Sequence, residues 1–184
     1  MKKLTISHLD PQDHLINPYE FFDWTEQSPV LALLKDFRIH QPPKVRSDAS
    51  ALDVARQMST DGVACKLVVD KAGELVGVLD EYRLCEQRLL MTQALQGVSR
   101  QELTASDMMQ PRADIPVVDY EALKGAYITD MVNTLREAGE AYCLVLDREA
   151  HQIRGLISAS DLAGRLHQTV TLKPKVSIAQ AVMS

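Results

Sequence analysis

Gly155-Leu156-Ile157-Ser158-Ala159-Ser160-Asp161-Leu162 is the stretch of sequence that decides how this chain folds. The apolar run that ends at Ile157 predicts a strand, and the amphipathic segment from Leu162 to His167 predicts a helix. A strand that enters a helix through small hydroxyl residues gathers free backbone N–H groups and hydroxyl donors, which suits a phosphate. An aspartate one turn in can accept hydrogen bonds from a ribose diol. Taken alone, however, Ser158 or Ser160 is better interpreted as the cap of the helix.

The composition is that of an ordinary soluble globular protein, since 46% of the 184 residues are apolar and 24% are charged. No apolar run approaches the ~18 residues of a membrane span. We see no signal peptide after Met1, so a cytoplasmic location is expected. The three cysteines form no C-x-x-C pair, which is typical of reduced, buried thiols. A net charge of −5 argues against general nucleic-acid binding, although it leaves room for a small anionic ligand.

An internal repeat relates the two halves of the chain. Residues 62–70, Gly-Val-Ala-Cys-Lys-Leu-Val-Val-Asp, match residues 139–147, Gly-Glu-Ala-Tyr-Cys-Leu-Val-Leu-Asp. Gly-Val-Leu at 77–79 likewise matches Gly-Leu-Ile at 155–157. Each copy predicts the element order extended–helix–strand–strand–helix over about 60 residues. A unit of this size could not bury much surface alone. We therefore expect the two copies to pack their sheets together about a pseudo-twofold axis, which creates two equivalent clefts.

The region before the repeats has a different character. Ser28-Pro29 predicts the start of a helix over Val30–Phe37. Four aromatic residues near it are expected to pack on a core or, alternatively, on a partner: Tyr19, Phe21, Phe22 and Trp24. In the first repeat, a second helix is expected from Asp80-Glu81-Tyr82 to about Leu95.

These patterns predict four segments of chain. They are an N-terminal arm and helix over 1–40, a first repeat over 41–100, a second repeat over 101–168 and a tail over 169–184 that could pack back on the core.

The repeats resemble a tandem pair of CBS domains, the arrangement called a Bateman module, from about Gln41 to Gln168. The residues that carry the resemblance are Leu-Val-Val-Asp at 67–70, Leu-Val-Leu-Asp at 144–147 and the Gly-apolar-apolar-Ser-x-x-Asp motif at 155–161. The resemblance implies an α/β (α+β) fold in which two β-α-β-β-α repeats pack with pseudo-twofold symmetry.

CBS pairs commonly bind AMP, ADP, ATP or S-adenosylmethionine in their clefts and pass occupancy on to a partner. By resemblance, Asp161 would bind the ribose, Ser158 and Ser160 the ribose–phosphate end, and Leu156 the base. The remaining expected site residues are Gly155 in the motif, Pro43, Val63 and Ala64 on the opposite wall, and Arg38 and His40 as the nearest phosphate partners.

The first copy departs from this motif. It has Asp80 where the second has Ser158, and Arg83 where the second has Asp161. An acid would repel a phosphate, and a guanidinium cannot accept from a ribose diol. We expect Asp80 and Arg83 to form an ion pair instead, which leaves one nucleotide site per chain.

Two further properties follow from the resemblance. A regulated partner is implied but not identified, and a homodimer is expected through two helix faces: Leu84-Leu89-Leu90 and Leu162-Leu166. These leucines could equally be intramolecular core. The alternative to a ligand sensor is a structural or dimerisation module with an unoccupied cleft.

An enzyme is disfavoured. Ser158, Asp161 and His167 have the residue types of a hydrolase triad, but no G-x-S-x-G elbow surrounds either serine. The sequence contains no H-x-x-x-H pair that would indicate a metal site, and no G-x-x-x-x-G-K-[ST] loop that would indicate nucleotide hydrolysis. No cofactor is implied with certainty.

Overall fold

A computed structural model describes residues 6, 8–15 and 24–166 of the chain. The predicted C-terminal tail, His167 and the aromatic residues Tyr19, Phe21 and Phe22 lie outside the described residues. Within the described part, no helix is both long enough and apolar enough to cross a membrane.

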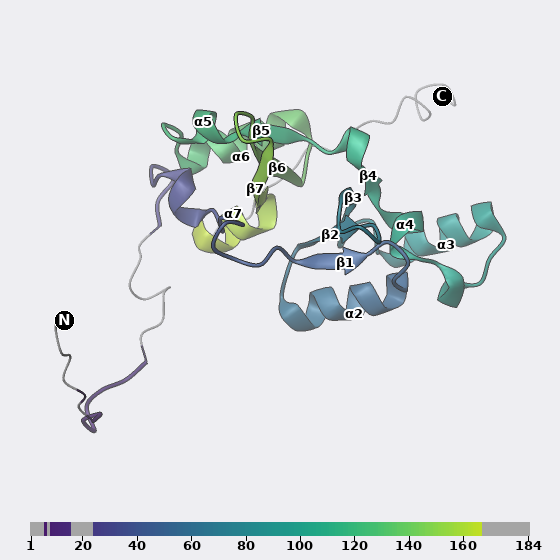
Figure 1. The fold of residues 1–184 in the computed structure, drawn as a ribbon, viewed down its shortest axis with the longest axis horizontal. Coiled ribbons are helices and arrows are strands. Elements are labelled where there is room, and N and C mark those ends of the chain that lie inside the picture. Colours follow the sequence, from purple (N-terminus) through teal and green to yellow (C-terminus); the bar gives the residue numbers. More distant parts are fainter. Residues whose placement is uncertain (1–5, 7, 16–23, 167–184) are drawn as a thin grey trace.

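Two small sheets form the centres of two lobes that lie side by side (Figure 1). The first sheet has the order β1-β2-β3-β4, and the second has the order β5-β6-β7. The strands are β1 (Lys44–Arg46), β2 (Cys65–Val69), β3 (Leu75–Asp80), β4 (Gln110–Pro111), β5 (Val117–Asp119), β6 (Tyr142–Asp147) and β7 (Gln152–Ser158). This mixture of strands and helices confirms the predicted α+β class.

Helices surround both sheets (Figure 1). The α-helices are α2 (Ala51–Asp61), α3 (Glu86–Gln96), α4 (Ala105–Met108), α5 (Tyr120–Leu123), α6 (Ile128–Ala138) and α7 (Ala159–Leu166). Short 3-10 turns are η1 (Val30–Leu33), η2 (Arg100–Glu102) and η3 (Arg112–Asp114).

The repeat seen in the sequence is present in the backbone. β1 pairs in parallel with β2 and β5 with β6, and β2–β3 and β6–β7 are antiparallel hairpins. The register shifts at the equivalent place in each hairpin, between Val68 and Val69 and between Val145 and Leu146. The central helices α2 and α6 both end at a left-handed glycine, Gly62 or Gly139, a conformation that a side chain would strain.

Each lobe is completed by the segment that precedes the other repeat. Val30 is fully buried among residues of the second repeat, whereas Ala105 and Met108 belong to the core of the first. A third cluster joins the two sheets and contains Cys65 and Leu67 from β2 and Leu144 from β6. Each lobe therefore has a core of its own, and the third cluster packs the two sheets together, as small domains with little surface to bury require.

The helix predicted over Val30–Phe37 is wrong in length, because only η1 forms, Leu34 has an extended backbone and residues 37–39 form a turn. The reason is a long-range contact: the Phe37 N–H donates to the Arg154 carbonyl at 2.8 Å, which draws this segment to the edge of β7. The second helix of the first repeat also begins later than predicted, at Glu86.

The leucines expected to form a dimer face are mostly core residues. Leu84, Leu89 and Leu162 are buried, and Leu166 packs against the core of the second lobe. Leu90 alone of this set is exposed.

We predict that Gly77→Ala destabilises the fold by about 1–3 kcal/mol, the usual range for overpacking. A Cβ at Gly77 would lie 2.6 Å from the carbonyl oxygen of Gln110, so β4 would have to move away from β3. Urea denaturation measures the change. Gly125→Ala is the control because a Cβ there meets nothing within 4 Å. Equal stability of the two variants would contradict the packing described for β4.

Candidate functional site

A cavity of about 280 Å³ lies where the two lobes meet the N-terminal segment. Three parts of the chain form its walls. The lining residues are Val30, Leu33, Lys35 and Phe37 from the N-terminal segment, Pro43 and Gly62 to Cys65 from the first repeat, and Leu156, Ile157, Ser160, Asp161, Leu162, Gly164 and Arg165 from the second.

The turn from β7 into α7 brings two of the expected residues to the cavity. Ser158 is 1% exposed, and its hydroxyl accepts the backbone N–H of Asp161 at 3.1 Å, which caps the helix. The Ser158 and Ser160 hydroxyl oxygens lie 3.2 Å apart. Ser160 and Asp161 are exposed and line the cavity. Ser158 therefore fixes the turn, while Ser160 and Asp161 are placed where a ligand could reach them.

The first repeat supplies the opposite wall, as the sequence indicated. Pro43, Val63 and Ala64 all line the cavity. The Pro43 carbonyl accepts the Leu67 N–H at 2.8 Å, which fixes the approach to β1. Gly62 ends α2 and turns the chain, so that residues 63 and 64 run along the cavity before β2 begins.

Arg38, His40 and Gly155 are not among the lining residues. The Arg38 guanidinium donates to Gln152 Oε1 at 2.9 Å and pairs with Asp147 at 3.3 Å. Gly155 is buried behind the wall, where a Cβ would lie 2.5 Å from Leu34 Cδ1. Leu156, the residue expected against the base, does line the cavity.

The comparisons with known proteins bear on this arrangement. The sequence model of the CBS-domain family matches residues 34–89, which include β1, α2, β2 and β3. This match places a CBS domain at residues 34–89 of the chain. Curated protein sequences give no match to it.

Several solved structures share the fold. A CBS-domain protein of unknown function from Thermoplasma acidophilum aligns with a TM-score of 0.54 and 18% identity over 85% of this chain and 73% of that one. An uncharacterised conserved protein from Pyrococcus horikoshii aligns with a TM-score of 0.55 and 13% identity over 81% of this chain and 99% of that one. CBSX2, solved in complex with AMP, aligns with a TM-score of 0.53 and 19% identity over 74% and 94% of the two chains. At these identities the likeness establishes the fold alone.

Sequence reasoning missed the third wall of this cavity, the one that includes Lys35 and Phe37. A helix was expected there, and residues two positions apart lie on different faces of a helix. In the structure Lys35 and Phe37 line the cavity, while Asp36 and Arg38 pair with residues of the second repeat. No signal in the sequence indicated this arrangement, because it depends on contacts with residues more than a hundred positions away.

The charges at the cavity are mixed. Lys35 and Arg165 bring positive charge, and Asp161 brings a carboxylate. Cys65 lies at the cavity, where burial, followed by the nearby carboxylates of Asp80 and Asp161, raises the pKa of its thiol far above the ordinary value. Cys65 is therefore a neutral, apolar part of the wall at neutral pH and not a nucleophile.

At the equivalent place between the two repeats, side chains contact one another. Tyr142 stands where the cavity has Cys65, and its hydroxyl donates to Gln110 Oε1. Arg83 lies beside the same hydroxyl, while the Asp80 carboxylate accepts the Arg83 backbone N–H at 2.9 Å. The expected Asp80–Arg83 ion pair is wrong for this part of the described chain, because the guanidinium turns to Tyr142 and the carboxylate to the backbone.

The described residues hold no group of three or more His, Cys, Asp or Glu side chains that could bind a metal ion. What the cavity offers is apolar surface, one exposed carboxylate, one hydroxyl and two cations. This set of groups can bind a polar molecule with an anionic end.

Proposed function

We propose that this chain is a regulatory module that binds an adenosine derivative in the cavity between its CBS repeats and relays occupancy to a partner. The observation that carries the proposal is the convergence of Ser160 and Asp161 with Pro43, Val63 and Ala64 on one cavity, although the two groups are about a hundred residues apart. CBSX2, which has the same fold, was solved with AMP.

Each part of the ligand has a matching wall. The Asp161 carboxylate accepts from the ribose hydroxyls, as acidic residues do at other nucleotide sites. Leu156, Val63 and Phe37 provide apolar surface for the base. Ser158 contributes by holding the Asp161 backbone in place.

The phosphate role goes to Lys35 and Arg165, which line the cavity, instead of Arg38 and His40, which do not. Two cations against one carboxylate favour a phosphorylated ligand over the cationic S-adenosylmethionine. A volume of about 280 Å³ is at the low end of small-molecule pockets, which favours AMP over ADP and ATP.

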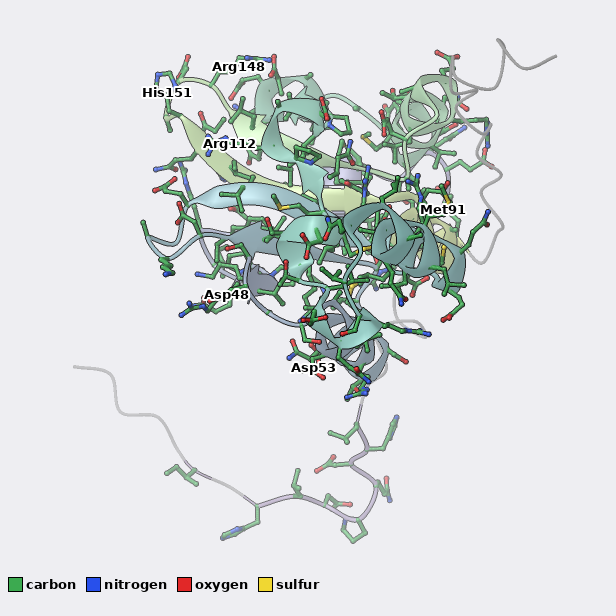
Figure 2. All side chains as sticks on the ribbon, turned by 90° about the vertical axis from the view of Figure 1, so that its right-hand side faces the viewer. Asp48, Asp53, Met91, Arg112, Arg148 and His151 are labelled. Atoms are coloured by element: carbon green, nitrogen blue, oxygen red, sulfur yellow. The ribbon has the colours of Figure 1, made fainter. Side chains whose placement is uncertain are left out.

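The second candidate is a structural or dimerisation module. It is favoured by the outer side of α3, where Leu90, Met91 and Leu95 are exposed (Met91 is labelled in Figure 2). Exposed apolar residues on one helix suit a second copy of the chain or a regulated partner. The two candidates are compatible, since α3 contributes no residue to the cavity.

Asp161→Ala is predicted to weaken AMP binding by at least tenfold, because the ribose hydroxyls lose their charged acceptor. Isothermal titration calorimetry measures the affinity, and thermal unfolding without ligand checks the fold. The backbone N–H bonded to Ser158 is unaffected by this change, so the melting temperature is expected to stay near that of the wild type.

Asp53→Ala is the matched control for Asp161→Ala. Asp53 is an exposed aspartate in the first turn of α2, paired at 3.0 Å with Arg56 and absent from the cavity (Figure 2). AMP binding to Asp161→Ala that equals binding to Asp53→Ala would contradict the assigned ribose contact.

We also predict one AMP per chain. Tyr142, Gln110 and Arg83 occupy the cleft equivalent to the cavity, so a second nucleotide has no space there and meets Arg83 where Asp161 would accept from the ribose. Calorimetric stoichiometry tests this, and two equal sites per chain would contradict it.

A further inference from the structure

The N-terminal segment that forms one wall of the cavity is attached to the second repeat. We call residues 24–38 the strap. Its Val30 N–H donates to the Ala126 carbonyl at 3.1 Å, and the Ile128 N–H donates back to the Ser28 carbonyl at 2.9 Å. In Figure 1 the strap lies on the lobe of α5, α6 and α7, before the chain crosses to β1.

One ion-pair cluster fastens the strap close to the cavity. Arg154 Nε donates to Asp36 Oδ1 at 3.0 Å, and Arg154 Nη2 pairs with the other oxygen of the same carboxylate. Arg154 Nη1 reaches Asp147 at 3.2 Å, and its guanidinium lies 4.2 Å from the Tyr120 ring centre. The Arg154 side chain is only 8% exposed, so this bidentate pair is shielded from solvent.

The pair is intact throughout the neutral range. The hydrogen bond from Arg154 lowers the pKa of the Asp36 carboxyl to about 2. A carboxyl whose pKa is lowered on folding stabilises the docked state above its ordinary pKa and loses that effect as the pH falls towards 2.

The position of Asp36 determines what its neighbours do. Lys35 and Phe37 flank Asp36 and line the cavity, while Asp36 itself points to Arg154. The Phe37 N–H donates to the Arg154 carbonyl, so Arg154 holds the strap through both its side chain and its backbone. Releasing this contact would free both cavity-lining side chains at once.

The strap differs from its counterpart in the other lobe. The counterpart, α4, continues on both sides into folded elements, η2 and β4. Upstream of the strap, residues 8–15 are exposed, lie away from both lobes (Figure 1) and hydrogen-bond with one another, as the Asp10 N–H does with Asp13. The described residues upstream of the strap, 6 and 8–15, contain no helix or strand that would have to move with it.

We propose that docking of the strap is coupled to occupancy of the cavity, with Asp36 and Arg154 as the positioning residues that hold Lys35 and Phe37 at its wall. This inference rests on the proposed function. Coupling is reciprocal: a ligand that contacts the docked strap holds it in place, and an empty cavity lets it open more often. The strap is thus the element that reports occupancy to the rest of the chain and to a partner.

The test is AMP titration by calorimetry of the wild type, Asp36→Asn and Asp119→Asn. Asp119 pairs with Arg148 at 2.6 Å in the same repeat, but it belongs neither to the cavity nor to the strap. Asp119→Asn therefore removes one paired carboxylate charge away from the site. We expect AMP affinity to fall at least tenfold in Asp36→Asn and to stay within twofold in Asp119→Asn. Asp36→Glu, which keeps the carboxylate, should recover most of the loss.

A second readout can be made on the wild type alone and then compared with Asp36→Asn. Hydrogen exchange of the Phe37 amide, which is bonded to Arg154, is expected to slow when AMP is added to the wild type and to respond less in Asp36→Asn. If the Asp36–Arg154 contact only stabilised the fold, AMP would slow exchange of the Phe37 amide equally in the wild type and in Asp36→Asn.

The outcomes separate the two proposals. Equal AMP affinity in Asp36→Asn and Asp119→Asn, or no AMP-dependent protection of Phe37 in a wild type that binds AMP, overturns the strap proposal and leaves the proposed function standing. Failure of the wild type to bind AMP overturns both. Should Asp36→Asn not fold, the exchange measurement on the wild type alone decides.

Discussion

Val30 precedes the first repeat and is completely buried in the core of the second, and Ala105, at the start of the second repeat, is completely buried in the core of the first. This exchange of short segments joins the two repeats. It is secured by equivalent backbone bridges, Pro29 to Tyr127 and Ser50 to Thr104. Because the exchanged segment on the second repeat continues as Lys35 to Phe37, the same packing that closes a core also builds a wall of the cavity. Fold and site therefore depend on one arrangement.

The sequence predicts the parts of this structure that are set locally. Left-handed glycines at 62 and 139 end the two central helices where the apolar stripes stop. The strands β2 and β6 coincide with the matched Leu-Val-x-Asp runs. The placement of Pro43 and Val63 opposite Asp161 follows from the repeat, because a pseudo-twofold arrangement of two such units brings these segments together.

Contacts between distant residues account for what the sequence did not predict. The apolar spacing of residues 30–37 suits a helix, but Asp36 and Phe37 bond to Arg154, more than a hundred positions away, and only the short η1 forms. The choice of Arg38 as a phosphate partner failed to anticipate its contacts with Asp147 and Gln152 for the same reason. The sequence does not indicate the role of Tyr142, because its contact with Gln110, at the place equivalent to Cys65, is visible only in the structure.

The central claim is that an anionic adenosine ligand occupies the cavity formed by three segments of the chain. Amide chemical shifts recorded by two-dimensional NMR during an AMP titration test it most directly. We expect the largest shifts to fall on Phe37, Ala64, Ser160 and Asp161, one or two from each wall. Shifts that gather instead on the exposed side of α3, or beside Tyr142, or an absence of shifts at millimolar AMP, would contradict it.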